Sequence, residues 1–388
     1  MIRVSTTLVR VGAGFIGLAL LASLWASPNR LASLPWFVTG IVGVALVVAV
    51  TGRWLPLVAD RIRPTHLTVF FIVTTSVALG AALLTSRWPS YKLSWLSAVY
   101  ATLPSIRSLP LAWTQQGLQP NQTGAILAVC SALTAAIALT PNPANRRRSN
   151  AESGQRGEVA RPTWRWIAAL LSIAGVIVVF MTGSRAALAG LVTAILLVLI
   201  LRTRRWLWAW GAGLGVVALG LYTSGRLAVI FRFFVHDETL DTKLVARLDI
   251  WLSAFRGIQD HPLTGIGLGV FNQVMPARYP YQTVGLSYPV SQAHNLFLDV
   301  ALAIGLPGAL GLLMLLLGLV LLAIAGLRLT HASRLISAGI LASLAAFLVF
   351  GITDQISFSI PTSFIIWLWA CSLAIIHERA QKENTSGV

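Results

Sequence analysis

Residues 308–328 read GALGLLMLLLGLVLLAIAGLR, a stretch with no charged side chain before Arg328. A helix needs about 20 consecutive apolar residues to cross the hydrocarbon core of a bilayer, and this stretch has that length. Backbone groups in hydrocarbon must find their hydrogen bonds within the segment itself. The stretch therefore predicts a membrane-spanning helix.

Similar runs recur along the 388-residue chain, of which 56% is hydrophobic and 11% charged. Its mean hydropathy is +0.77. A soluble domain carries about 25% charged residues, so this chain cannot cover a surface that faces water. We predict an all-α polytopic membrane protein with about ten (10–12) spanning helices. The predicted spans are 8–26, 35–51, 67–85, 122–140, 164–181, 186–201, 206–223, 308–328, 335–353 and 360–377.

These spans divide the chain into three parts. Residues 1–223 hold about seven transmembrane helices. Residues 224–293 form one long hydrophilic segment. Residues 294–388 begin with a helix at the membrane face and continue with about three transmembrane helices.

The net charge of +17 follows from topology. If the N-terminus lies in the cytoplasm, most basic residues fall in cytoplasmic segments, including the run Arg146-Arg147-Arg148 in the polar linker 141–163. This is the positive-inside rule, so nucleic-acid binding is not expected. Segments 86–121 and 224–293 then face the periplasm. We expect a multi-pass protein of the bacterial inner membrane with its active site on the periplasmic side.

The segment 224–293 contains more than linker. Apolar residues recur at helical spacing between 241 and 259, which predicts an amphipathic helix. Pro262 and the glycines that follow end it, and we expect 272–289 to be irregular because it is rich in Tyr and Pro. A short helix is predicted over 292–304, and the sequence Gly305-Leu306-Pro307-Gly308 separates it from the next span.

Several motifs have plain structural interpretations. The glycines of GAGFIG at 12–17 match a dinucleotide fingerprint but lie inside the first span, where small residues mediate helix packing. Asn121 begins a weak glycosylation sequon. The lone Cys130 and Cys371 lie in apolar runs and suggest neither a disulfide nor a metal. No Asp-x-Asp pair is present, which argues against a metal-dependent nucleotide-sugar transferase.

Three polar residues are predicted to lie at the outer face. Arg185 follows a tight turn between two spans, Arg247 lies on the amphipathic helix, and His294 precedes a helix. Separately, each has an ordinary interpretation: an arginine reaching to headgroup phosphates, a salt bridge to Asp249 or Asp241, and a structural histidine. Together they suit transfer from a diphosphate, because arginine binds phosphate oxygens bidentately and a neutral histidine accepts a proton from a hydroxyl.

The motifs that carry these residues resemble the O-antigen ligase and O-antigen polymerase family. They are Thr182-Gly183-Ser184-Arg185-Ala186-Ala187-Leu188, then Arg247-x-x-Ile250-Trp251, then the glycine-rich stretch 261–271, and finally Ala293-His294-Asn295-Leu296-Phe297-Leu298. The resemblance covers roughly residues 120–330.

The resemblance implies a GT-C-like fold and a metal-independent, inverting glycosyl transfer with no cofactor. The donor would be a glycan on undecaprenyl diphosphate, and the acceptor lipid A–core or another glycan. Arg185 and Arg247 would bind the diphosphate, and His294 would serve the acceptor hydroxyl as the catalytic residue. Ser184, Asn295, Gly265 and Gly267 are expected to support the site.

Three alternatives stay open. A polymerase of the same family would use the same residues with a second lipid-linked glycan as acceptor. A transporter should carry polar residues at mid-membrane, whereas the predicted spans have almost no charge at their centres. A non-catalytic membrane scaffold would not need two arginines and a histidine at one face.

Overall fold

The computed structural model describes residues 2–52, 54–89, 93–103, 118–139, 163–202, 215–216, 223, 239–283, 290–354 and 360–386. Every regular element in these ranges is helical. The elements are α1 (Ile2–Ala26), α2 (Arg30–Thr51), α3 (Leu55–Arg61), α4 (Pro64–Thr85), η1 (Ser94–Leu96), α5 (Ser97–Thr102), α6 (Pro120–Leu139), α8 (Thr163–Met181), α9 (Arg185–Arg202), α12 (Thr239–Asp260), α13 (Phe271–Arg278), α14 (Leu296–Gly326), α15 (His331–Thr353) and α16 (Ile360–Ser386).

Seven of these helices are long and apolar enough to cross a membrane, namely α1, α2, α4, α6, α8, α14 and α15. The prediction of an all-helical polytopic membrane protein is thus confirmed for the described residues. Two further predicted spans correspond to α9, which is apolar but shorter, and to α16. The predicted span 206–223 lies outside the described residues apart from 215–216 and 223, so the total of about ten spans stays a prediction.

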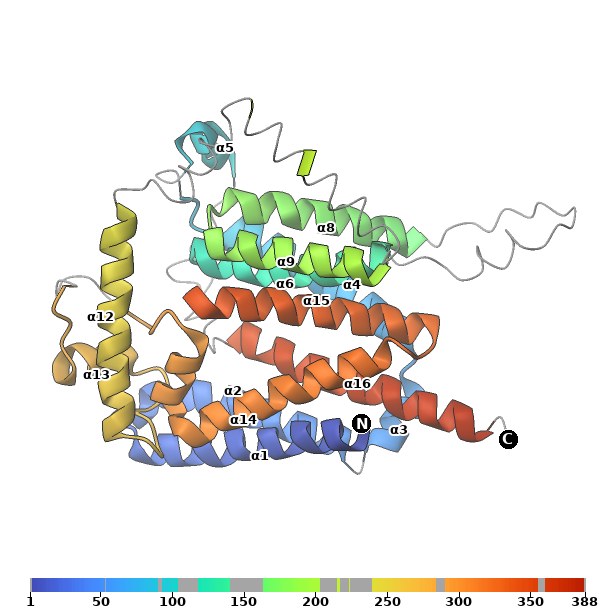
Figure 1. Cartoon of the computed structure of the whole chain (residues 1–388), viewed down its shortest axis with the longest axis horizontal. Coiled ribbons are helices and arrows are strands. Elements are labelled where there is room, and N and C mark those ends of the chain that lie inside the picture. Colours follow the sequence, from blue (N-terminus) through green and yellow to red (C-terminus); the bar gives the residue numbers. More distant parts are fainter. Residues whose placement is uncertain are drawn as a thin grey trace, which may run out of the picture.

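The long helices lie side by side, and α12 lies across one end of the bundle (Figure 1). We refer to this as the α12 end. Hydrogen bonds join segments that meet there: Tyr100 donates to the carbonyl oxygen of Met181 (2.6 Å), and Ser23 donates to that of Ala303 (2.8 Å). Both chain termini lie away from α12 (Figure 1).

Glycines near the N-terminus pack helices, as the sequence predicted, with the exception of Gly14. A Cβ atom on Gly12 would lie 2.6 Å from the carbonyl oxygen of Gly311 in α14, and one on Gly318 would lie 2.7 Å from a methyl of Val9. Small residues of this kind let membrane helices approach closely. Gly14 would meet nothing within 4 Å. Gly12 therefore packs α1 against α14, and Gly17, where a Cβ would lie 3.3 Å from Val44, packs it against α2.

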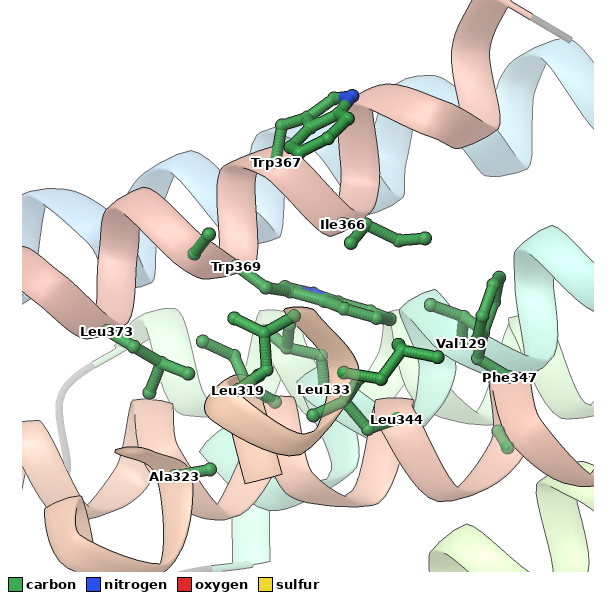
Figure 2. Packing of buried hydrophobic residues seen from close by; sticks show 14 of the residues in the cluster. Val129, Leu133, Leu319, Ala323, Leu344, Phe347, Ile366, Trp367, Trp369 and Leu373 are labelled. Carbon is green, nitrogen blue, oxygen red and sulfur yellow. The ribbon is translucent and has the colours of Figure 1, made fainter. Parts of the chain in front are cut away.

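The core between α6, α14, α15 and α16 surrounds Trp369 (Figure 2). Its indole ring is almost fully buried and meets Phe347 edge to face, with ring centroids 6.3 Å apart. Leu133, Leu319 and Leu344 fill the space around the two rings (Figure 2). This contact fixes α16 against helices that begin or end at the α12 end.

The helix α14 is broken where the sequence predicts it. Ile304 and Gly305 have non-helical backbone angles, and Gly305 has φ 75°. The freed amide of Leu306 donates to the carbonyl oxygen of Pro262 (2.7 Å). The short first part begins at Leu296 rather than at the predicted residue 292, because the Asn295 side chain caps it by accepting from two backbone amides.

The expectation of irregular structure over 272–289 is wrong for its first part, which forms α13. Phe271, Val274 and Met275 lie on one face and are buried against α12. Pro276 stands inside α13, near its C-terminal end. Tertiary burial of three apolar side chains thus outweighs the unfavourable proline.

Candidate active site

A buried carboxylate at the α12 end joins three chain segments. Asp354, directly after α15, is only 2% exposed. Its Oδ2 accepts a hydrogen bond from Asn121 Nδ2 at 2.9 Å, and its Oδ1 accepts one from Gln292 Nε2 at 2.9 Å. The Nδ1 atom of His294 lies 3.1 Å from the same Oδ1. We call these four residues the Asp354 cluster.

The contact with Asp354 assigns the tautomer of His294. An ionised carboxylate can only accept hydrogen bonds, so Nδ1 of the neutral imidazole carries the proton. The other ring nitrogen, Nε2, then has a free lone pair and can accept a proton. His294 is partly exposed, with 28% of its side chain accessible. The pair thus has the chemistry of a general base held in place by a carboxylate.

The backbone around His294 is fixed by hydrogen bonds on both sides. His294 has φ 52°, in the left-handed region of backbone conformation that residues other than glycine rarely adopt. The amide of Ala293 donates to Asp299 Oδ1 at 2.9 Å, and its carbonyl accepts from Trp251 Nε1 at 2.9 Å. Asn295 caps α14 and also donates to the carbonyl oxygen of Ile352 at 3.0 Å. These contacts hold His294 in a strained conformation, which is typical of functional sites.

Arg247 is placed near the His294 segment by Trp251, which lies on the same helix. The two residues lie one turn apart on α12, on the same side of the helix, and Trp251 contacts the residue that precedes His294. Asp249, on the same helix, accepts three hydrogen bonds from the backbone and side chain of residues 282 and 283. The predicted amphipathic helix therefore carries Arg247 to the neighbourhood of His294.

Arg185 is the first residue of α9, which starts at the α12 end. Gly183 in the preceding turn has φ 59°, and the Ser184 hydroxyl caps α9 by accepting from the amide of Ala187 at 3.4 Å. The turn rests on Gly124 of α6, where a Cβ would lie 2.7 Å from Thr182 Oγ1.

The helix α6 links Arg185 with the Asp354 cluster. Asn121 binds Asp354, and one helical turn further Gly124 supports the turn that precedes Arg185. The structure thus brings the three predicted residues to one end of the bundle. Only His294 belongs to the Asp354 cluster itself, and the two arginines lie on α9 and α12 at the same end of the bundle.

The predicted supporting glycines shape a loop against the break in α14. Gly265 has φ 64° and Gly267 has φ 110°. The amides of Ile266 and Gly267 donate to the carbonyl oxygens of Leu302 (2.8 Å) and Ala303 (3.3 Å). A Cβ on Gly265 would lie 2.5 Å from the Ala303 carbonyl carbon. The tight turn predicted from these glycines is present, and it anchors α12 to α14.

A small cavity of about 80 Å³ lies beside this loop. Asp299 is part of its wall and also accepts a hydrogen bond from the amide of Ala293, the residue before His294. Its lining among the described residues is Trp36, Ile266, Gly267, Leu268, Gly269, Phe271, Ser291, Asp299, Leu302 and Ala303. The described part of the chain holds no group of three His, Cys, Asp or Glu side chains placed to bind a metal.

Three members of the Asp354 cluster were missed as site residues by sequence reasoning. Asp354 stands in none of the motifs, and Asn121 was interpreted only as the start of a sequon. The sequence did contain one signal for Asp354, namely its position. It follows the predicted span 335–353, which ends at the same membrane face as the segment before His294. Gln292 carried no signal of its own.

A family model described as O-antigen ligase (Wzy_C) matches residues 167–313. The matched segment runs from α8 into α14 and includes Arg185, Arg247 and His294, but neither Asn121 nor Asp354. The resemblance drawn from the motifs is thereby confirmed, and the match indicates a membrane enzyme of ligase or polymerase type with glycosyltransferase-like activity. No curated protein matches the chain.

Proposed function

We propose that this chain, whose residues 167–313 match the model of the O-antigen ligase family, transfers a glycan from a polyprenyl-diphosphate carrier to an acceptor hydroxyl. The observation that carries this proposal is the contact between His294 and the buried Asp354. It supplies a base of fixed tautomer at one end of a membrane bundle. The reaction is proposed to invert the anomeric centre without a metal.

His294 takes the proton of the acceptor. As the acceptor oxygen attacks the anomeric carbon, its proton passes to Nε2 of His294. The new glycosidic bond forms while the bond from that carbon to the diphosphate oxygen breaks, and the diphosphate leaves with the bonding electrons. The imidazole becomes an imidazolium, and the carboxylate of Asp354 stabilises this charge in a site partly shielded from water.

The two arginines stabilise the leaving group. Negative charge grows on the diphosphate as its bond to the sugar breaks, and a guanidinium positioned there is favourable in the transition state. Arg185 adds the N-terminus of α9, where backbone amides favour anions. Arg247 approaches from α12 and so contacts the diphosphate from a second direction.

The membrane arrangement fits a lipid-linked donor. The polyprenyl chain stays in the bilayer beside the apolar spans, and its head reaches the α12 end. The basic linker 141–163 and the short loops predict that this end faces the periplasm. We therefore propose the inner membrane as the location and the periplasmic face as the place of reaction.

Reconstitution tests the proposal. The purified chain in proteoliposomes receives a glycan on undecaprenyl diphosphate together with lipid A–core. Sugar on lipid A–core indicates a ligase, whereas a ladder on the carrier indicates a polymerase of the same family. If neither product forms and the carrier-linked glycan instead crosses the bilayer, the chain is a transporter and the proposal is rejected.

The matched variants are His294→Ala and His66→Ala. His66 is an exposed histidine at the opposite end of the bundle, beside Arg63. We expect transfer to be lost in the first variant and kept in the second, with equal insertion of both. Normal transfer by His294→Ala would overturn the assignment of the base.

A further inference from the structure

The helix α12 has two apolar faces, and only one of them is covered. Ile250, Ala254 and Ile258 are buried against α13 and the start of α14. On the opposite side the apolar side chains are largely exposed. They are Val245 (48%), Leu248 (46%), Leu252 (62%) and Phe255 (53%).

The exposed residues form a continuous stripe. Their spacings of three, four and three residues place them on one side of a helix of 3.6 residues per turn. We call Val245, Leu248, Leu252 and Phe255 the α12 stripe. A contiguous apolar surface of this kind marks a place where a protein meets an apolar partner.

The α12 stripe lies close to an exposed apolar side of a membrane-spanning helix. Leu263, just beyond α12, is 69% exposed. Its neighbour Pro262 accepts a hydrogen bond from the amide of Leu306 in α14. From there the second part of α14 presents Leu306, Leu310, Leu313 and Leu317, all about half exposed, along one side. That side belongs to a helix long and apolar enough to span the membrane. Leu263 therefore adjoins the apolar side of α14, and the exposed Gln259 and Asp260 separate it from Phe255.

The orientation and charge of α12 also fit an apolar partner with anionic groups, such as a lipid surface. The helix lies across the bundle, level with the outer ends of α1 and α14 (Figure 1). This is the position of a helix that lies along the membrane surface. Arg256 is exposed directly beside Phe255, where a cation can meet lipid phosphates. An apolar stripe with an exposed arginine beside it fits an interfacial membrane helix.

We propose that α12 is an interfacial helix whose stripe inserts among the acyl chains of phospholipids in the outer leaflet. The lipid bilayer is thus the partner that covers this face. The inference rests on the exposure of the stripe, on its position and on its nearness to the spans, and does not depend on the proposed transferase activity. It places Arg247 and Trp251, on the same helix, at the depth of the lipid headgroups.

Depth measurement on the full-length chain tests this proposal. Single cysteines at Leu252 and Phe255, in a Cys130→Ala, Cys371→Ala background, receive a fluorophore in proteoliposomes made with brominated phospholipids. Interfacial helices lie about 5–10 Å into the boundary between headgroups and acyl chains. We therefore expect stronger quenching by bromines near the headgroup end of the acyl chain than by bromines at its tip.

Two matched positions calibrate the measurement. Leu317→Cys lies eleven residues beyond Leu306, about 16 Å along the helix and near the middle of a roughly 30 Å core. It should be quenched best by bromines at the chain tip. Gln282→Cys is exposed on the turn held by Asp249 and should respond to aqueous iodide only.

Two results would overturn the proposal. One is quenching of positions 252 and 255 by iodide but not by either brominated lipid, which means that the stripe faces water. The other is protection from both quenchers together with disulfide formation between chains at position 252, which means that a second copy covers the stripe.

Discussion

Replacing Asp354 by asparagine separates the charge of this residue from its shape. The carboxylate accepts hydrogen bonds from Asn121, Gln292 and His294. In Asp354→Asn the amide oxygen can stay beside Gln292 and His294, and a half-turn of the Asn121 amide presents an oxygen to the new NH2 group. The tautomer of His294 is thus preserved, while the negative charge beside its ring is lost.

The size of the effect follows from the kind of hydrogen bond that is lost. A hydrogen bond to a charged group contributes about 1.5–3 kcal/mol and one between neutral groups about 0.5–1.5 kcal/mol. The imidazolium formed in the reaction therefore loses roughly 1–1.5 kcal/mol of stabilisation. Because 1.36 kcal/mol corresponds to a tenfold change in rate, kcat should fall about 5- to 15-fold. The neutral histidine of the ground state loses less, so the KM for the donor should change little.

The assay is glycan transfer in proteoliposomes at saturating donor and acceptor, with Asp354→Ala measured beside it. Alanine leaves the buried Gln292 amide without this acceptor, which costs about 1–3 kcal/mol of stability, so this variant should lose thermal stability as well as activity. A wild-type kcat in Asp354→Asn would refute the role of the charge. An unchanged kcat with a raised KM would instead make Asp354 a substrate contact.

Three other changes have distinct outcomes. Tyr100→Phe removes the hydrogen bond to Met181 beneath the turn that precedes α9, which should cost about 1 kcal/mol of stability. It should also raise the KM for the donor more than it lowers kcat, and an unchanged KM would contradict this. Gly12→Ala places a Cβ 2.6 Å from the α14 backbone, whereas the Cβ of Gly14→Ala meets nothing within 4 Å. Only Gly12→Ala should therefore lower the melting temperature in detergent, and equal melting temperatures of the two variants would refute the packing argument. Arg247→Lys keeps the positive charge but cannot bind phosphate bidentately. Donor binding should therefore weaken about tenfold, by roughly 1.4 kcal/mol, while the protein still folds. Unaltered donor binding would show that Arg247 is not part of the diphosphate site.

The spans and the break in α14 could be predicted because local sequence determines them. A helix that crosses a bilayer needs a minimum apolar length, and this requirement is visible in any stretch such as 308–328. The left-handed backbone at Gly305 and the proline two residues later likewise act on their own neighbours. The short helix α13 was missed because its formation depends on burial against α12, a contact that the sequence around Pro276 does not reveal.

The candidate site could be predicted only in part. His294 and Arg247 stand in motifs with chemical meaning of their own. The carboxylate that gives His294 its tautomer lies 60 residues away, after two further predicted spans, and nothing local to Asp354 marks it as a partner. What the sequence did contain was topology: both residues stand at span ends on the same side of the membrane. Topology limits which residues can meet, but the three-dimensional packing selects among them.

The strain at His294 connects the two proposals. A residue other than glycine in a strained backbone conformation costs about 1–3 kcal/mol, and it persists only where surrounding contacts offset that cost. Here the neighbouring residues Ala293 and Asn295 are hydrogen-bonded to α12, α14 and α15, and the ring itself to Asp354. The contact from α12 comes from Trp251, on the helix that we propose to lie in the membrane interface. If the bilayer holds α12 in place, it also helps to hold the base in its strained position, and the geometry of His294 then depends on lipid as well as on protein.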